Sequence, residues 1–272
     1  MLSICDTFKR RNNFPWRGGK YSLNRENVLV IGGAAGIGKQ IVLDFAGRGK
    51  KVAVADINKK ALDQLINESG RPNDIFSFEV DVSNWESVQN MMTKVKETLN
   101  SIDIFVYSAG ITKQVSFLNI DWASWKKTIA VNLHGLFFST KAVLPLMKNK
   151  NGGSIIIIGS GSAITGSGGG IHYAASKGGA FGFMRSLVGE LGKEGININV
   201  IAPRVIESDM LDRLYPSEGS KNTLKKEIPI GRLGKPSDIS NLTNFLSNEE
   251  SAYIHGQIII ADGGRTFRPK SG

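Results

Sequence analysis

The 272-residue sequence has little cysteine, little histidine and no long apolar run. Its single cysteine, Cys5, excludes an internal disulfide and any zinc site built from several cysteines. Three histidines, His134, His172 and His255, are scattered without the spacing of metal ligands. The longest purely aliphatic run, residues 155–158, is far shorter than the roughly 20 residues of a membrane-spanning helix. We therefore expect no metal site and no membrane span.

Basic residues outnumber acidic ones by 34 to 24, which gives a formal net charge of +10. Residues 1–27 carry an excess of this charge, and the rest mixes both signs without a basic stripe interleaved with aromatics. This pattern favours a solvated basic surface over nucleic-acid binding. We interpret residues 1–27 as a basic N-terminal arm of a cytoplasmic protein. A mitochondrial leader, which would place the protein in the matrix, is the alternative.

From residue 28 onward, short apolar runs alternate with segments compatible with helices. The runs predicted as strands are 28–31, 51–55, 75–80, 102–107, 154–158, 197–202 and 257–260. The predicted helices are 37–48, 59–67, 85–99, 121–148, 173–193 and 237–247. Strands that are apolar on both faces and alternate with helices indicate a covered parallel sheet. Residues 28–272 are therefore predicted to form a single α/β domain, a Rossmann-type doubly wound parallel sheet with helices on both faces.

A glycine-rich turn, Gly32-Gly33-Ala34-Ala35-Gly36-Ile37-Gly38, lies between the first predicted strand and helix. Glycines there let the backbone approach a pyrophosphate, which the free N–H groups of the helix N-terminus bind. Asp56 ends the second strand, where a carboxylate accepts hydrogen bonds from an adenosine 2′-hydroxyl and repels a 2′-phosphate. The turn and Asp56 predict a nicotinamide dinucleotide, NAD(H) in preference to NADP(H). Asp56 as an acid at the start of the next helix is the alternative.

Tyr173 and Lys177 are four residues apart and share one face of a predicted helix. A phenol with its ordinary pKa of about 10 is a weak base at neutral pH. A neighbouring ammonium group lowers that pKa toward the working range. A tyrosine and a lysine at this spacing often lie on a helix surface without any catalytic role. A catalytic interpretation of the pair therefore depends on the residues around it.

Several other short motifs occur along the chain before and after this pair. Together with the pair, in chain order, they are Gly32…Gly36-Ile37-Gly38, Asp81-Val82, Ala109-Gly110, Asn132, Ser160, Tyr173…Lys177, Pro203 and Asp262-Gly263-Gly264. From about Val28 to Gly264 the chain resembles the short-chain dehydrogenase/reductase family in its common single-domain form. Ser160 stands 13 residues before Tyr173, which is the usual separation in that family.

The resemblance implies a catalytic set of Asn132, Ser160, Tyr173 and Lys177. Tyr173 would be the general acid/base, Ser160 would hold the same substrate oxygen, and Ser162 is the alternative for Ser160. Lys177 would lower the pKa of Tyr173 and bind the nicotinamide ribose, and Asn132 would hold a water. The implied cofactor-binding residues are Gly32, Gly36, Ile37, Gly38, Asp56, Asp81, Val82, Ala109, Gly110, Tyr173, Lys177, Pro203 and Ile206. Ser160, Ser162 and Arg204 are the candidate substrate contacts.

The chain departs from the family pattern near the site. Ile31 replaces a usual threonine and Tyr107-Ser108 replaces a usual asparagine pair, so we expect lost hydrogen bonds between central strands and lower stability. Arg204 stands where glycine usually follows Pro203. Its guanidinium would reach the nicotinamide end and pair with an anionic substrate group, or with Glu207 or Asp209.

The segment 205–229 is long and charged, and is expected to be a mobile substrate lid. Its polarity leads us to interpret the protein as an NAD-dependent oxidoreductase that interconverts a secondary alcohol, such as a polyol or sugar, and its ketone. The enzymatic alternative is an NADPH-dependent 3-oxoacyl-thioester (acyl-carrier) reductase. A dinucleotide-sensing scaffold is the non-enzymatic alternative. The family resemblance also implies a homodimer or homotetramer.

Overall fold

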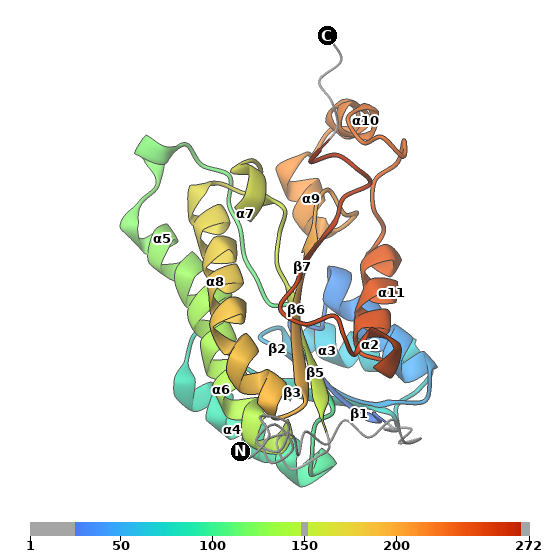
Figure 1. The fold of residues 1–272 in the computed structure, drawn as a ribbon. Helices are drawn as coiled ribbons and strands as arrows, with labels where there is room; N and C mark the ends of the chain where they lie inside the picture. The colour runs from blue at the N-terminus through green and yellow to red at the C-terminus, as the bar shows by residue number, and fades with distance from the viewer. Residues whose placement is uncertain (1–24, 148–151, 268–272) are drawn as a thin grey trace, which may run out of the picture.

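The structure, a computed structural model, describes residues 25–147 and 152–267. One sheet of seven parallel strands runs in the order β3-β2-β1-β4-β5-β6-β7 (Figure 1). The strands are β1 (Asn27–Ile31), β2 (Lys51–Asp56), β3 (Ile75–Glu79), β4 (Ile104–Tyr107), β5 (Gly153–Ile158), β6 (Ile196–Pro203) and β7 (Ile258–Ala261). The strand order reverses between β1 and β4, which is the switch point where doubly wound sheets bind ligands. The predicted fold class is confirmed.

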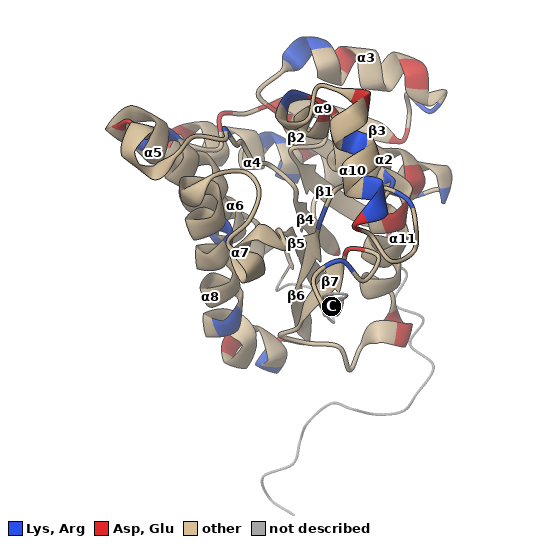
Figure 2. Ribbon diagram, turned by 90° about the horizontal axis from the view of Figure 1, so that it is seen from above, with Lys and Arg blue, Asp and Glu red and all other residues tan. Residues whose placement is uncertain are grey.

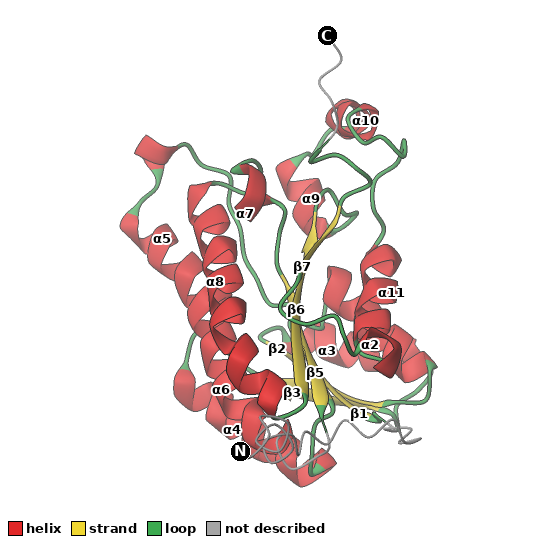
Figure 3. Ribbon diagram, in the orientation of Figure 1, coloured by secondary structure: helices red, strands yellow, loops and turns green. Residues whose placement is uncertain are grey.

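Helices cover both faces of the sheet (Figure 3). They are α2 (Gly36–Gly47), α3 (Lys59–Ser69), α4 (Trp85–Leu99), α5 (Trp122–Ile129), the π-helical η2 (Ala130–His134), α6 (Gly135–Met147), α7 (Ser162–Thr165), α8 (Ile171–Lys193), α9 (Asp209–Leu214), α10 (Glu218–Lys226) and α11 (Pro236–Leu246), with short 3-10 turns at Phe117–Asn119 and Glu249–Ser251. Helices α4, α6 and α8 pack on one face, and α2, α3 and α11 on the other. Of the predicted arm, residues 1–27, the part up to residue 24 lies outside the described residues.

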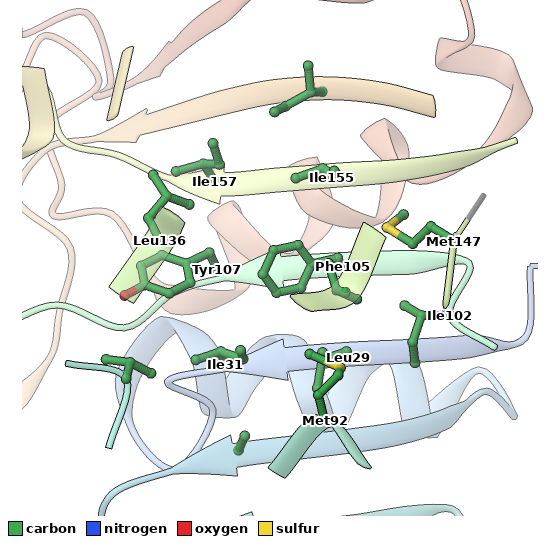
Figure 4. Packing of buried hydrophobic residues seen from close by; sticks show 14 of the residues in the cluster. Leu29, Ile31, Met92, Ile102, Phe105, Tyr107, Leu136, Met147, Ile155 and Ile157 are labelled. Carbon is green, nitrogen blue, oxygen red and sulfur yellow. The ribbon is translucent and has the colours of Figure 1, made fainter. Parts of the chain in front are cut away.

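Successive residues of each central strand pack on opposite faces of the sheet. Leu29, Phe105 and Ile155 pack on the face that meets α4 and α6, where Met92 and Leu136 cover them (Figure 4). The intervening strand residues belong to the cluster on the other face. Because both faces are buried, the central strands are apolar throughout, as the sequence shows.

The predicted helical region 121–148 forms a helix with an irregular middle. Helices α5 and α6 are joined by the π-helical segment η2, so the helical stretch Trp122–Met147 is continuous but irregular. This stretch is long and apolar enough to span a membrane by length and composition. Leu136, Val143 and Met147 on it are fully buried against the sheet. Packing in the core therefore accounts for these three side chains, whereas Trp122 and Phe137 on the same stretch are exposed.

The segment 205–229, expected as a mobile loop, instead contains α9 and α10. Ser208 accepts a hydrogen bond from the backbone of Leu211, and Ser217 accepts one from Ser220. These serine side chains satisfy the free N–H groups at the two helix starts. The serines three residues before Leu211 and Ser220 were the sequence signal for these helices.

Charged residues of both signs are interspersed along the helices in the view from above (Figure 2). One basic residue counted with the N-terminal arm, Arg25, is buried. It donates hydrogen bonds to the Ser154 hydroxyl at 2.5 Å and to the carbonyl of Ser247 at 2.6 Å. Arg25 therefore fastens the start of β1 to the body of the protein.

Tyr107-Ser108 stands in place of the usual asparagine pair, and a hydrogen bond was expected to be lost there. Tyr107 makes a different hydrogen bond. Its fully buried hydroxyl donates a 2.6 Å hydrogen bond to the carbonyl of Val131 in η2. A Cβ atom on Gly135 would lie only 2.5 Å from this hydroxyl. The glycine therefore leaves room for the phenol, and strand β4 is fixed to η2 by a new contact.

Candidate active site

The residues predicted to bind a dinucleotide meet at one edge of the sheet. Gly32 follows β1, Asp56 ends β2, Asp81 and Val82 follow β3, Ala109 and Gly110 follow β4, and Pro203 ends β6. The strands are all parallel, so their carboxyl ends lie together (Figure 2). This edge includes the switch point between β1 and β4, so the topology brings the predicted residues to the place where a ligand is expected.

The glycine-rich turn is closed tightly by its own backbone. Gly32 has a φ of +77°, and a Cβ atom there would lie 2.3 Å from the backbone nitrogen of Ala109. A Cβ on Gly38 would lie 2.0 Å from the carbonyl oxygen of Gly32. Gly36 differs, because its nearest neighbour would be the Ser208 side chain at 3.8 Å. Two of the glycines therefore serve close packing and the third leaves an open approach.

The start of α2 suits a bound anion. Its N-cap, Ala35, provides no side-chain hydrogen bond, and the first turn contains no acidic residue. The free N–H groups and the positive end of the helix dipole are left for a ligand. Together with the open approach at Gly36, this arrangement fits the pyrophosphate of a dinucleotide.

Asp56 is engaged with the protein backbone. One carboxylate oxygen accepts a hydrogen bond from the N–H of Ala34 at 3.1 Å, and the other accepts one from Asn58 at 3.1 Å. The strand register places Ala55 opposite Ile31, so Asp56 stands directly beside the turn. The carboxylate therefore holds the glycine-rich turn to the end of β2.

Tyr173 and Lys177 project from α8 toward Ser160, which follows β5. The Tyr173 hydroxyl is hydrogen-bonded to Ser160. Burial raises the pKa of Tyr173, and this hydrogen bond partly lowers it. The sequence predicted a net lowering by Lys177, so the expected direction of the pKa shift is wrong for this structure. Removal of the phenol from water outweighs the effect of its neighbours.

Lys177 is buried beneath the tyrosine. Its Nζ atom lies 5.8 Å from the centre of the Tyr173 ring and donates a 2.8 Å hydrogen bond to the carbonyl of Ile158. Burial lowers the pKa of Lys177 to about 8. A Cβ atom on residue 110 would lie only 3.2 Å from the Lys177 Nζ atom. Gly110 has no Cβ, and it therefore leaves space between Lys177 and the end of β4.

Asn132 lies in the π-helical segment and is almost completely buried. Its Oδ1 atom accepts from the N–H of Ile111 at 2.8 Å, while Nδ2 donates to the carbonyl of Ile111 and to the Ser176 hydroxyl. Both amide hydrogens are therefore used within the protein. The side chain fastens the loop after β4 to α8, and its predicted role in holding water stays a prediction.

Ser160, and not Ser162, is the hydroxyl next to Tyr173. The backbone N–H of Ser162 donates to the Ser160 oxygen at 3.1 Å and so helps to orient it. Sequence reasoning missed Thr112, whose hydroxyl donates to the carbonyl of Gly169 at 2.5 Å. A Cβ on Gly169 would lie 2.5 Å from the Tyr173 ring. Thr112 thus holds the loop that packs on the catalytic candidate.

Two further candidates follow β6. Ile206 is buried and pairs with Gly234 in an isolated parallel bridge. The Arg204 guanidinium donates to the hydroxyls of Ser167 at 2.8 Å and Thr266 at 3.2 Å. It does not pair with Glu207 or Asp209, which was one of the expected arrangements.

A doubly wound sheet with a phosphate-binding turn and a tyrosine–lysine pair at its carboxyl edge defines a dinucleotide-dependent oxidoreductase class. A family profile described as enoyl-(acyl carrier protein) reductase matches residues 32–266. The chain belongs to the short-chain dehydrogenase/reductase family, as its motifs predicted.

Curated relatives and a solved structure agree with this assignment. The chain is 36% identical to the 3-oxoacyl-(acyl-carrier-protein) reductase FabG of Thermotoga maritima over 87% of its length and 96% of the relative's. It is 35% identical to the (2S)-((R)-hydroxy(phenyl)methyl)succinyl-CoA dehydrogenase subunit BbsD of Thauera aromatica, over 88% and 96%. A solved short-chain dehydrogenase/reductase of Brucella melitensis, titled glucose/ribitol dehydrogenase, superposes with a TM-score of 0.85 at 29% identity, over 90% of this chain and 98% of that one.

The expected preference for NAD(H) is corrected by these relatives. Several of them carry the name 3-oxoacyl-(acyl-carrier-protein) reductase, the class for which NADPH is the usual cofactor. Asp56 was taken as a partner of the adenosine ribose. In the structure its carboxylate accepts hydrogen bonds from the N–H groups of Ala34 and Asn58. Asp56 therefore has a role in the turn, and its contact with the cofactor stays a prediction.

Proposed function

We propose that the protein is an NADP(H)-dependent reductase of 3-oxoacyl thioesters. The observation that carries the proposal is the Ser160–Tyr173–Lys177 group, in which Tyr173 is half-buried between two buried partners, in a chain whose curated relatives bear this name. The BbsD relative is also named for a thioester, a succinyl-CoA derivative. These names support the alternative of the sequence interpretation over its leading polyol hypothesis.

The residues would divide the work as follows. The bound cofactor supplies a hydride to the carbonyl carbon. Ser160 donates a hydrogen bond to the carbonyl oxygen, and Tyr173 gives that oxygen a proton. Because burial raises the pKa of Tyr173, the phenol carries its proton at neutral pH, as a proton donor in reduction requires. Lys177 lies beneath the ring and would bind the ribose hydroxyls next to the reacting carbon.

NADPH oxidation with acetoacetyl-CoA as substrate tests the proposal. We expect turnover with NADPH exceeding that with NADH, and its loss in Tyr173→Phe by about a hundredfold or more, which is the usual contribution of general acid catalysis. Tyr253→Phe, at a fully exposed tyrosine, is the matched control and should keep wild-type activity. Turnover of ribitol or another polyol with no reduction of thioesters would refute the proposal.

The polyol hypothesis keeps one specific observation. The Brucella melitensis structure is titled glucose/ribitol dehydrogenase, and Ser162 and Ser167 closely follow Ser160 along the chain. The same assay therefore includes ribitol and glucose with NADP⁺ and NAD⁺. Binding of dinucleotide without turnover of either substrate class would favour the scaffold alternative.

A further inference from the structure

Arg204 lies in the candidate site, yet the proposed chemistry does not use it. The residue follows Pro203 at the carboxyl end of β6, and its side chain crosses Gly161. A Cβ on Gly161 would lie 2.2 Å from Cγ of Arg204 and 2.4 Å from its Cδ. Gly161 is the residue after Ser160, and neighbouring Cα atoms are about 3.8 Å apart. The arginine side chain therefore passes one residue from Ser160, whose side chain bonds to Tyr173.

The guanidinium group connects two segments that are distant in sequence. Ser167 lies in the loop before α8, and Thr266 follows β7. Their hydroxyls accept from Nη2 at 2.8 Å and from Nη1 at 3.2 Å. Both partners are neutral, and in residues 25–147 and 152–267 no carboxylate forms a salt bridge with Arg204. The planar cation thus has hydrogen bonds but no counter-charge in contact.

Nearby acids are committed to other groups. Glu227 forms an ion pair with Arg265. Asp262 accepts hydrogen bonds from the backbone N–H groups of Gly264 at 2.9 Å and Thr266 at 2.6 Å. Burial and the charge of Arg265 lower the pKa of Arg204 against the attraction of these acids. An arginine keeps its charge in proteins, so the environment holds a partly desolvated cation beside the Ser160 group.

We propose that Arg204 determines substrate specificity by binding an oxyanion, a carboxylate or a phosphate, carried by the substrate beyond its ketone. A guanidinium fork matches the two oxygens of such a group, and a charged acceptor binds it more strongly than the neutral hydroxyls of Ser167 and Thr266. The inference rests on the proposed reduction of a 3-oxoacyl thioester. Arg204 is a specificity-determining residue and takes no part in proton transfer.

Three thioesters separate the possible sources of the anion. Acetoacetyl-N-acetylcysteamine is uncharged, 3-oxoadipyl-N-acetylcysteamine adds a carboxylate to the acyl chain, and acetoacetyl-CoA adds phosphates on the thiol side. We expect the wild-type KM to be at least about tenfold lower for one or both anionic substrates than for the neutral one. Arg204→Met should abolish that ratio by raising KM for the anionic thioesters. Arg204→Lys should restore part of the ratio, and Arg185→Met, on the exposed part of α8, should leave it intact.

Binding without turnover provides a second readout. Glutarate and CoA are added to the holoenzyme with NADP⁺, and the thermal midpoint is measured for wild type and both Arg204 variants. At least one anion should raise the midpoint of wild type and not that of Arg204→Met. Equal KM values for neutral and anionic thioesters, together with no midpoint shift, would overturn the inference and leave the proposed function standing. Failure of wild type to reduce any of the three thioesters would instead refute the proposed function, and the midpoint shifts would still decide the role of Arg204.

Discussion

Replacing Lys177 with methionine should abolish activity and stabilise the fold. The folded protein lowers the pKa of this lysine from 10.5 to about 8, because burial disfavours its charged form. One pH unit corresponds to about 1.4 kcal/mol, so burying the charge costs about 3 kcal/mol at pH 7. Methionine has a similar shape without the charge, but it leaves the carbonyl of Ile158 without its 2.8 Å hydrogen bond. That loss costs about 1 kcal/mol, so the net gain is about 2 kcal/mol.

The pH dependence of this gain identifies its origin. The unfolded lysine keeps its ordinary pKa of 10.5, whereas the folded one loses its proton near pH 8. Between these values the unfolded state binds more protons, so wild-type stability rises with pH. The advantage of Lys177→Met is therefore largest below pH 8 and is lost as the pH approaches 10.5.

Thermal and denaturant unfolding of the apo-protein at pH 7 and pH 10 measures the effect. For a domain of this size the expected gain raises the thermal midpoint by about 4–8 °C at pH 7. Lys127→Met, at an exposed lysine of α5, is the matched control and should change the midpoint little at either pH. A variant that is no more stable than wild type at pH 7, or that keeps its advantage at pH 10, would refute the reasoning.

Three further predictions concern the packing around the site. Gly135→Ala should lower the free energy of unfolding by about 1–3 kcal/mol, because the added methyl group overpacks against the Tyr107 hydroxyl. The loss should be smaller in a Tyr107→Phe background. A double-mutant cycle in which the two losses simply add would contradict the contact. Asp56→Ala should lower the apo-protein's free energy of unfolding by about 1–3 kcal/mol, because two backbone N–H groups lose their acceptor. Asp56→Asn should lower it by a smaller amount. Equal thermal midpoints for wild type and both variants would contradict this prediction. Burial lowers the pKa of His172, so the unfolded state binds a proton first as the pH falls below about 6.5, and the stability of the fold falls with the pH. In His172→Leu the difference between the thermal midpoints at pH 7.5 and pH 5.5 should therefore be smaller than in wild type. An unchanged difference would show that this histidine is not the source of the pH dependence.

The fold was predictable because burial imposes a simple pattern. Central strands that are covered on both faces must be apolar throughout, and the segments between them had room for single helices. The predicted boundaries of β5 and α4 differ from the structure by one residue or none. The π-helical η2 was not predictable, because its irregular turn reflects the packing of Asn132 and Tyr107 and leaves no periodic signal in the sequence.

The candidate site was predictable to the extent that its motifs are local. Tyr173 and Lys177 share a helix, so their spacing alone places them on one face. Thr112 and Ser176 were missed because each acts through a contact with a segment far along the chain, Gly169 in one case and Asn132 in the other. Such contacts depend on strand order, which a single sequence does not state.

Asp56 shows that a correctly placed residue can make a contact that the sequence does not reveal. The sequence locates a carboxylate at the end of β2, where an adenosine ribose would lie. The parallel pairing of β1 and β2 also brings the glycine-rich turn to this point, since the N–H of Gly32 donates to the carbonyl of Ala55 at 2.7 Å. The nearest unsatisfied donor is then the N–H of Ala34, which binds the carboxylate directly. Position in a motif therefore fixes where an acid lies, whereas the pairing of neighbouring strands decides which backbone groups it contacts.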